Sequence, residues 1–278
     1  MAKDWRLLLS SPLPGPANMA TDEALLRSVH EGASGTVRLY TWDGPWISVG
    51  RFQNAAEEID FTLCAAKGVG TVRRLTGGKA ILHRPGDVTY SVAALQEESP
   101  LSGGIMDSYR AINHALVEGL RILGVHATMR EQPPLWPDTG MDIGCFERAY
   151  RHEIYWAGRK LVASAQRRQG GGFLQQGTVP GTETGAGLAS FARRGPGQRV
   201  TLARDLAERT GTLRRALDRD PSFEEVAAAL AEGFRRAWGV ALVAGDLTTE
   251  EGTLATELER ERYTQEAWNL TRDPVRLP

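Results

Sequence analysis

The fold class follows from one stretch, Glu153-Ile154-Tyr155-Trp156-Ala157-Gly158-Arg159-Lys160-Leu161-Val162-Ala163. Its two halves are rich in β-forming residues and meet at Ala157-Gly158, which predicts a β-hairpin. The residues from Val37 to Val49 predict a second hairpin across Asp43-Gly44. Because hairpins dominate the strand connections, we expect an α+β fold with a mixed, largely antiparallel sheet flanked by helices.

Helices are indicated by capping residues and by apolar residues three and four positions apart. Asn18 is a candidate cap of the first helix, and residues 60–67 predict a short helix whose inner face includes Cys64. Residues 181–200 are rich in glycine, serine and threonine and predict a loop. The other candidate caps are Asp107, the pair Ser222 and Glu225, and the pair Thr248 and Glu251.

Composition excludes several classes of protein. The chain has 278 residues, of which 41% are hydrophobic and 24% charged, so it is not a disordered chain. A net charge of −1 argues against nucleic-acid binding through overall charge. No apolar run approaches the ~18 residues of a membrane span, and no signal-peptide core is visible, so we expect no membrane association and a cytoplasmic location. The 2 cysteines and 5 histidines have no metal-ligand spacing, and no metal site is expected.

The first stretch that could carry chemistry is Arg73-Arg74-Leu75-Thr76-Gly77-Gly78-Lys79-Ala80-Ile81-Leu82-His83. Adjacent glycines let backbone N–H groups approach a ligand closely, and the preceding arginines could bind a carboxylate or phosphate. The alternative is a strand, a turn and a strand with a solvated basic flank. The spacing excludes a phosphate loop of the Gly-x-x-x-x-Gly-Lys-Ser/Thr type.

Two further residues, Lys160 and Cys145, stand out by their surroundings. Small residues, Ala163-Ser164-Ala165, follow Lys160 and leave space for a ligand beside the strand, although most lysines are simply exposed. Cys145 lies in a loop, fifteen residues before Lys160, whereas Cys64 has the setting of a buried small hydrophobe. A nearby ammonium would favour the thiolate of Cys145, but the spacing alone does not bring the two together.

Positive charge is concentrated near these motifs. Residues 145–168 hold six basic and two acidic side chains, which gives 6 − 2 = +4, and residues 73–84 hold four basic side chains and no acidic one. These segments are either ordinary solvated surfaces or a basic rim suited to an acidic partner.

The motifs in this order resemble the biotin/lipoate protein ligase family, which includes the lipoyl and octanoyl ligases and transferases. The stretch Arg73 to Gly78 with His83 five residues on, the strand Gly158 to Gln166, and Ser48 to Gln53 are similar to that family's conserved elements. The resemblance implies a single catalytic domain over residues 1–278. Its ligase-like core would span about 33–245, followed by a helical C-terminal segment at 246–278.

Within that family, Cys145-Phe146 ahead of the lysine strand is similar to the LipM-type octanoyltransferases, in which a cysteine here forms an acyl thioester. The resemblance implies catalytic roles for Cys145 and Lys160. Lys79 stands where arginine or glycine is more usual, and Arg84-Pro85-Gly86 is a local variation. The substrate-binding residues implied are Arg74, Thr76, Gly77, Gly78, His83, Ser164 and Ala165.

The implied reaction moves an octanoyl group from octanoyl-acyl carrier protein to the lysine of a lipoyl domain, such as the glycine-cleavage carrier protein. A thioester is already activated, so no nucleotide and no other cofactor is expected. Three alternatives remain at this point: an ATP-dependent lipoate-protein ligase, an amidotransferase between lipoyl domains, and a non-catalytic subunit that binds acylated carrier domains.

Overall fold

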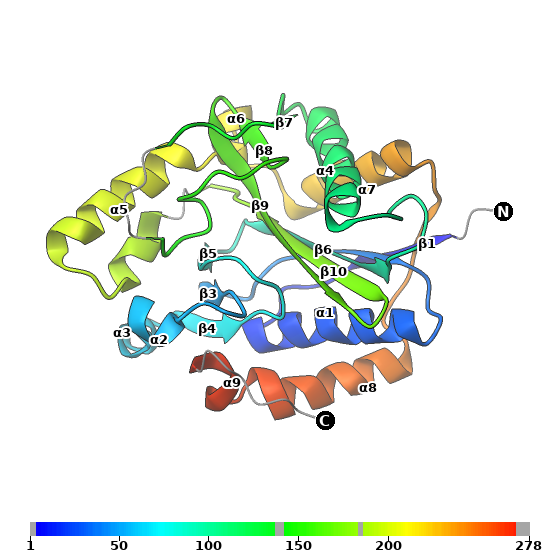
Figure 1. Ribbon diagram of the computed structural model, residues 1–278, viewed down its shortest axis with the longest axis horizontal. Helices are drawn as coiled ribbons and strands as arrows, with labels where there is room; N and C mark the ends of the chain where they lie inside the picture. Colours follow the sequence, from blue (N-terminus) through cyan, green and yellow to red (C-terminus); the bar gives the residue numbers. More distant parts are fainter. Residues whose placement is uncertain (1–3, 137–141, 183–185, 271–278) are drawn as a thin grey trace.

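The computed structural model describes residues 4–136, 142–182 and 186–270 (Figure 1). Its main feature is an eight-stranded sheet in the order β11-β1-β2-β6-β10-β9-β8-β7. The pairs β11–β1 and β1–β2 are parallel and the other pairs are antiparallel, which confirms the predicted mixed, largely antiparallel sheet. The strands are β1 (Trp5–Leu9), β2 (Thr36–Tyr40), β6 (Val88–Leu95), β7 (Thr128–Met129), β8 (Ile154–Trp156), β9 (Arg159–Gln169), β10 (Gly172–Val179) and β11 (Leu242–Ala244).

A second, three-stranded sheet has the order β4-β3-β5 and carries the glycine-rich stretch between two of its strands. The predicted hairpin from Val37 to Val49 is wrong, because β2 lies in the large sheet and β3 in the small one. Pro45 follows the expected turn and its carbonyl accepts a hydrogen bond from Gly70, which directs the chain towards β4. The strands of this sheet are β3 (Trp46–Val49), β4 (Gly70–Arg73) and β5 (Ile81–His83).

Helices cover both faces of the large sheet (Figure 1). Helices α4 (Ile105–Ile122) and α7 (Phe223–Trp238) lie on one face, and α1 (Gly15–His30) and α8 (Thr249–Leu258) on the other. The remaining helices are α2 (Ala55–Glu58), α3 (Phe61–Ala66), η1 (Ala186–Phe191), α5 (Pro196–Arg209), α6 (Leu213–Leu217), η2 (Glu259–Tyr263) and α9 (Glu266–Leu270).

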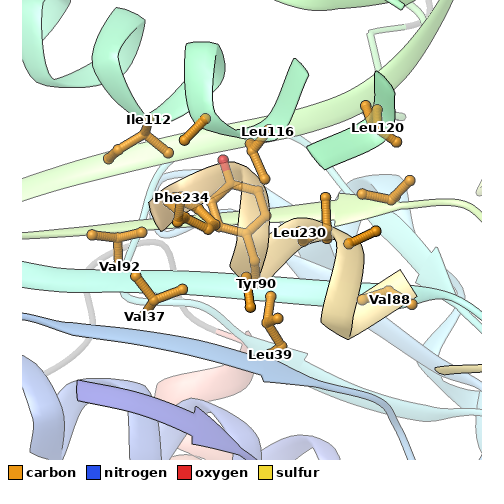
Figure 2. Packing of buried hydrophobic residues seen from close by; sticks show 14 of the residues in the cluster. Val37, Leu39, Val88, Tyr90, Val92, Ile112, Leu116, Leu120, Leu230 and Phe234 are labelled. Atoms are coloured by element: carbon orange, nitrogen blue, oxygen red, sulfur yellow. The ribbon is translucent and has the colours of Figure 1, made fainter. Parts of the chain in front are cut away.

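Strand alternation divides the core between the two helical layers. Val37 and Leu39 of β2 point towards α4 and α7, where Figure 2 shows them packed near Tyr90 and Val92 of β6. Tyr40 belongs to the cluster on the α1 side. Labelled side chains from the helices complete the α4–α7 layer in Figure 2: Ile112, Leu116, Leu120, Leu230 and Phe234.

Two of the predicted helix caps are confirmed and two are not. Gly104 is the N-cap of α4, and Asp107 lies three residues inside that helix, where its side chain accepts a hydrogen bond from the N–H of Gly104. The side chains of Ser222 and Thr248 cap α7 and α8 as predicted, and Cys64 is buried in α3. Asn18 does not cap α1, because Pro14 and Pro16 start that helix four residues earlier than the expected cap allows. Residues 181–200 are not wholly a loop, since they contain η1 and the start of α5.

The C-terminal helices are joined to the glycine-rich region by Arg73. Its guanidinium is fully buried and donates hydrogen bonds to the carbonyls of Gly50 and Gln53 and to those of Trp268 and Asn269 in α9. The expectation that Arg73 binds a ligand anion is therefore wrong: it binds backbone carbonyls. Among the helices that the structure describes, none has the length and apolar character needed to span a membrane.

Candidate active site

Cys145 is held beside the glycine turn by backbone hydrogen bonds. Its N–H donates to the carbonyl of Ala80 over 2.9 Å, and the N–H of Ala80 donates to the carbonyl of Ile143 over 2.9 Å. One carboxylate oxygen of Glu147 accepts from the N–H groups of Ile143 and Gly144 and closes the loop before the cysteine. The cysteine is thus fixed in place while remaining partly exposed.

Lys160 lies against this loop and is fully buried. Its Nζ is 2.5 Å from Oε1 of Glu153, 2.9 Å from the carbonyl oxygen of Cys145 and 3.4 Å from that of Arg148. Burial by itself would lower the pKa of Lys160, but the adjacent charge of Glu153 raises it above its ordinary value of 10.5. The side chain is therefore an ammonium group whose hydrogens are directed at three protein oxygens.

The glycine turn is shaped by Arg74, whose guanidinium donates to the carbonyls of Gly77 and Lys79 over 2.9 and 3.0 Å. Gly78 has a φ of +88°, a backbone conformation that would be strained in a residue with a side chain. A β-carbon at this position would lie 4.0 Å from the sulfur of Cys145. On the other side of the turn, a β-carbon on Gly50 would lie 1.9 Å from the carbonyl oxygen of Gly78. The turn therefore fits closely between Gly50 and the cysteine.

A pocket opens beside the sulfur of Cys145. It lies between the small sheet, helix α1 and strands β9 and β10, and small residues of β9 leave the space that the sequence predicted. The apolar part of its lining comprises Met19, Tyr40, Trp42, Ile81, Ala163, Ala165 and Gly177, and the polar part comprises Arg74, His83, Thr89, Cys145, Ser164, Gln176 and Thr178.

His83 forms part of this wall as a neutral imidazole. Its ring stacks on Trp42 with the centroids 4.0 Å apart, and Nε2 lies 2.6 Å from the hydroxyl of Ser48. Arg74 donates to the same hydroxyl over 2.8 Å. Burial, together with the charge of Arg74, lowers the pKa of His83 well below 6.5. The histidine therefore presents an uncharged surface to the cavity.

Part of the cavity wall, formed by Tyr40 and Gln176, rests on a buried ionic network that sequence reasoning missed. Asp22 of α1 accepts hydrogen bonds from Arg38 over 2.8 Å and from the hydroxyl of Tyr40 over 2.9 Å, and it also pairs with Gln176. Met19 lies one turn earlier on α1 beside Gln176. A visible signal was present, because two polar residues four apart, at positions 18 and 22, interrupt the apolar face of α1.

A second cavity is also lined by Cys145. The two cavities share Ile81, Cys145 and Thr178, so the cysteine stands at their junction. The second cavity is also lined by Leu188 of η1 and Leu206 of α5, which belong to the part of the chain where the sequence predicted a loop or gave no site.

The structure brings most of the predicted site residues together. Cys145 and Lys160 meet, although the contact is to the cysteine's carbonyl. Arg74, His83, Ser164 and Ala165 line the first cavity. Gly78 lies beside Arg74, Ala165 and Cys145 of that lining, and Gly77 precedes it in the turn. Thr76 lies behind the wall, where its hydroxyl donates to Gln176 over 3.0 Å. Among the described residues, no group of three histidine, cysteine or acidic side chains could hold a metal ion.

Comparison with known proteins identifies the class. The family model for the lipoyl protein ligase A/B catalytic domain matches residues 14–235, which include the glycine turn, Cys145 and the lysine strand. The chain belongs to this family, as the resemblance of its motifs predicted.

Comparison with individual proteins narrows the class further. The chain is 39% identical over 271 residues to the octanoyltransferase LipM of Kyrpidia tusciae. The matched region covers 95% of this chain and 98% of that protein. It is 38% identical over 278 residues to the octanoyltransferase LipM of Symbiobacterium thermophilum, covering 97% and 99%. The prediction of an acyltransferase enzyme is thereby confirmed.

Solved structures agree on the fold. A bi-partite lipoate protein ligase from Thermoplasma acidophilum has a TM-score of 0.82 with 27% identity, covering 98% of this chain and 99% of that one. A lipoate-protein ligase A bound with ATP has a TM-score of 0.78 with 27% identity, covering 96% and 99%. The predicted ligase-like fold is therefore confirmed.

Proposed function

We propose that the protein transfers an octanoyl group from octanoyl-acyl carrier protein to the lysine of a lipoyl domain, with the glycine-cleavage carrier protein as the acceptor, through a thioester on Cys145. The observation that carries the proposal is the position of the sulfur, partly exposed, at the junction of two cavities and next to the Gly77-Gly78 turn. The similarity to octanoyltransferases supports the choice of acyl group.

In the first step, the thiolate of Cys145 attacks the thioester carbonyl of the donor. A new carbon–sulfur bond forms to Cys145, the old one breaks, and the carrier's thiolate leaves. The developing oxyanion needs donors, and in the part of the chain that the structure describes no protein acceptor lies against the N–H groups of Gly77 and Gly78. These two groups are our candidates for the oxyanion site.

The octanoyl chain occupies the first cavity in this proposal. Seven carbons beyond the carbonyl, each contributing ~0.8 kcal/mol when buried, supply roughly 5 kcal/mol. The uncharged ring of His83, stacked on Trp42, suits a hydrocarbon better than an imidazolium would. Tyr40 and Gln176 belong to the cavity lining, and their hydrogen bonds to Asp22 hold that wall rigid against longer chains.

In the second step, the neutral amine of the acceptor lysine attacks the thioester on Cys145. The amide bond forms, the carbon–sulfur bond breaks, and the proton lost by the amine ends on the cysteine sulfur. Lys160 remains an ammonium throughout, because Glu153 stabilises its charge. We assign Lys160 to holding the loop of residues 145–148 in the geometry that both steps need.

The test is to incubate the protein with octanoyl-acyl carrier protein and to measure its intact mass. We expect a gain of one octanoyl group in the wild type and in Cys64→Ser, and no gain in Cys145→Ser. Cys64 is a suitable control because burial and the charge of Asp60 raise the pKa of its thiol to about 11. Acylation that persists in Cys145→Ser would overturn the thioester proposal.

The same preparation separates the alternative functions. Modification of an acceptor by free lipoate with a requirement for ATP would indicate a ligase. Transfer from an acylated lipoyl domain in preference to the acyl carrier protein would indicate an amidotransferase. Binding of acylated carriers without transfer under any of these conditions would indicate a non-catalytic subunit. An acceptor panel that includes the glycine-cleavage carrier protein tests the acceptor assignment.

A further inference from the structure

Two arginines, Arg51 and Arg167, lie near the glycine turn. Arg51 lies over the ring of Trp268 at 4.7 Å and beside the ring of Phe52 at 5.9 Å. Arg167 of β9 donates to the neutral side chain of Gln169 over 2.7 Å. Within residues 4–136, 142–182 and 186–270, no carboxylate forms an ion pair with either guanidinium. Both side chains are partly buried.

The carboxylate near these arginines is already engaged. Glu23 forms ion pairs with Arg27 and Arg262 and accepts a hydrogen bond from the hydroxyl of Tyr263. Burial and the like charges of Arg167 and Arg262 lower the pKa of Arg51. Positive charge therefore exceeds negative charge at this place, and an added anion would be stabilised there.

Both arginines are close in the chain to residues that contact the glycine turn beside the reacting sulfur. Arg51 directly follows Gly50, which contacts the carbonyl of Gly78. Arg167 is two residues beyond Ala165 on β9, about 7 Å along the strand, and the Cβ of Ala165 lies 3.7 Å from the β-carbon position of Gly78. A ligand with its carbonyl at Cys145 could thus extend an anionic group towards both guanidinium groups.

We propose that Arg51 and Arg167 form a binding site for the phosphate diester of the phosphopantetheine arm that carries the donor acyl group. The inference rests on the proposed function, because it assumes a donor whose thioester ends such an arm. Guanidinium groups suit this ligand, since each can offer two parallel N–H donors to a phosphate. Phe52 is 67% exposed beside Arg51, and it offers an apolar surface to the two methyl groups next to that phosphate.

The test uses two unreactive analogues, the octanoyl amides of 4′-phosphopantetheine and of pantetheine, in which nitrogen replaces the thioester sulfur. Their dissociation constants are measured by calorimetric titration of the full chain. We expect the wild type to bind the phosphorylated analogue about tenfold more tightly, because a hydrogen-bonded charge contributes that much. Arg51→Gln and Arg167→Gln should each reduce this ratio. The matched control is Arg236→Gln, an exposed arginine of α7 that should keep it.

Equal affinity of the wild type for both analogues would overturn the proposal. The proposal would also be overturned if the preference for the phosphorylated analogue were unchanged in both Arg51→Gln and Arg167→Gln. An effect of the substitutions seen with octanoyl-acyl carrier protein as donor, but absent with the analogues, would also overturn it and would assign the arginines to the surface of the carrier domain. None of these readings requires turnover. The wild type could prefer the phosphorylated analogue tenfold and yet form no octanoyl thioester on Cys145. That result would contradict the proposed function and leave the phosphate site standing.

Discussion

The ammonium of Lys160 donates a hydrogen bond to the backbone carbonyl of Cys145 over 2.9 Å. The contact makes the lysine a support of the loop that carries the sulfur. Its other partners, Glu153 and the carbonyl of Arg148, extend that support along the loop. A role for Lys160 in catalysis thus begins with the position of the cysteine backbone.

Removing the lysine should affect stability and activity separately. Lys160→Met leaves the carboxylate of Glu153 buried without its partner, which costs about 3–5 kcal/mol of unfolding free energy. The double variant Lys160→Met with Glu153→Gln should recover much of that loss in chemical denaturation. It should not recover acylation of Cys145, because the carbonyls of residues 145 and 148 still lack their donor. Full recovery of acylation would contradict the supporting role.

The contact between Gly50 and the glycine turn leads to a second prediction. In Gly50→Ala the new methyl group would meet the backbone of Gly78 and must displace the turn. We expect the rate of Cys145 acylation to fall about 100-fold, the effect of losing one oxyanion donor. Gly44→Ala is the control, since a β-carbon there meets no atom within 4 Å. The rates are measured by intact mass over time, and equal rates in both variants would contradict the prediction.

Met19 should influence the length of acyl chain that the enzyme accepts. Its side chain lines the first cavity beside Gln176, so Met19→Ala lengthens the space available to a hydrocarbon tail. We expect the ratio of decanoyl to octanoyl transfer to rise at least about fivefold, which is 1 kcal/mol of added chain burial. The exposed Met106→Ala on α4 serves as the control. The measurement is competition between the two acyl carrier proteins, and an unchanged ratio would place the acyl chain elsewhere.

The buried histidine predicts a loss of stability in acid. Burial and Arg74 keep the pKa of His83 well below 6.5, whereas the unfolded chain takes up a proton as the pH falls through 6.5. The unfolded state then binds more protons, so the free energy of unfolding decreases by up to about 1.4 kcal/mol per pH unit below 6.5. In His83→Gln, denaturant titrations between pH 7.5 and 5 should show a shallower decrease. An identical slope in both proteins would contradict this assignment.

Local patterns in the sequence predicted local structure well. The caps at Ser222 and Thr248 depend on residues three positions away, and the hairpin at Ala157-Gly158 on its two adjoining strands. The failures depend on distant residues. The side chain of Asn18 accepts a hydrogen bond from Arg38 and donates one to the carbonyl of Thr41, and a helix-cap pattern can reveal neither contact.

The candidate site divides in the same way. The motifs identified Cys145, Lys160 and the glycine turn because each has a distinctive sequence neighbourhood. The far wall of the first cavity could not be predicted, since Met19 and Gln176 come together from α1 and β10, 157 positions apart. The orientation of Lys160 towards a carbonyl also depends on Glu153, whose importance no spacing rule indicates.

The buried guanidinium of Arg73 connects the site to residues made much later in translation. It joins the carbonyl of Gly50 to that of Trp268, and Arg73 and Trp268 are 195 positions apart. A growing chain that has left the ribosome only as far as Leu258 already contains Cys145 and Lys160. It still lacks the α9 carbonyls that hold Arg73, so the loop at Gly50 is incomplete. In newly made protein, the reactive sulfur is therefore synthesised before the α9 carbonyls that complete the hydrogen bonds of Arg73.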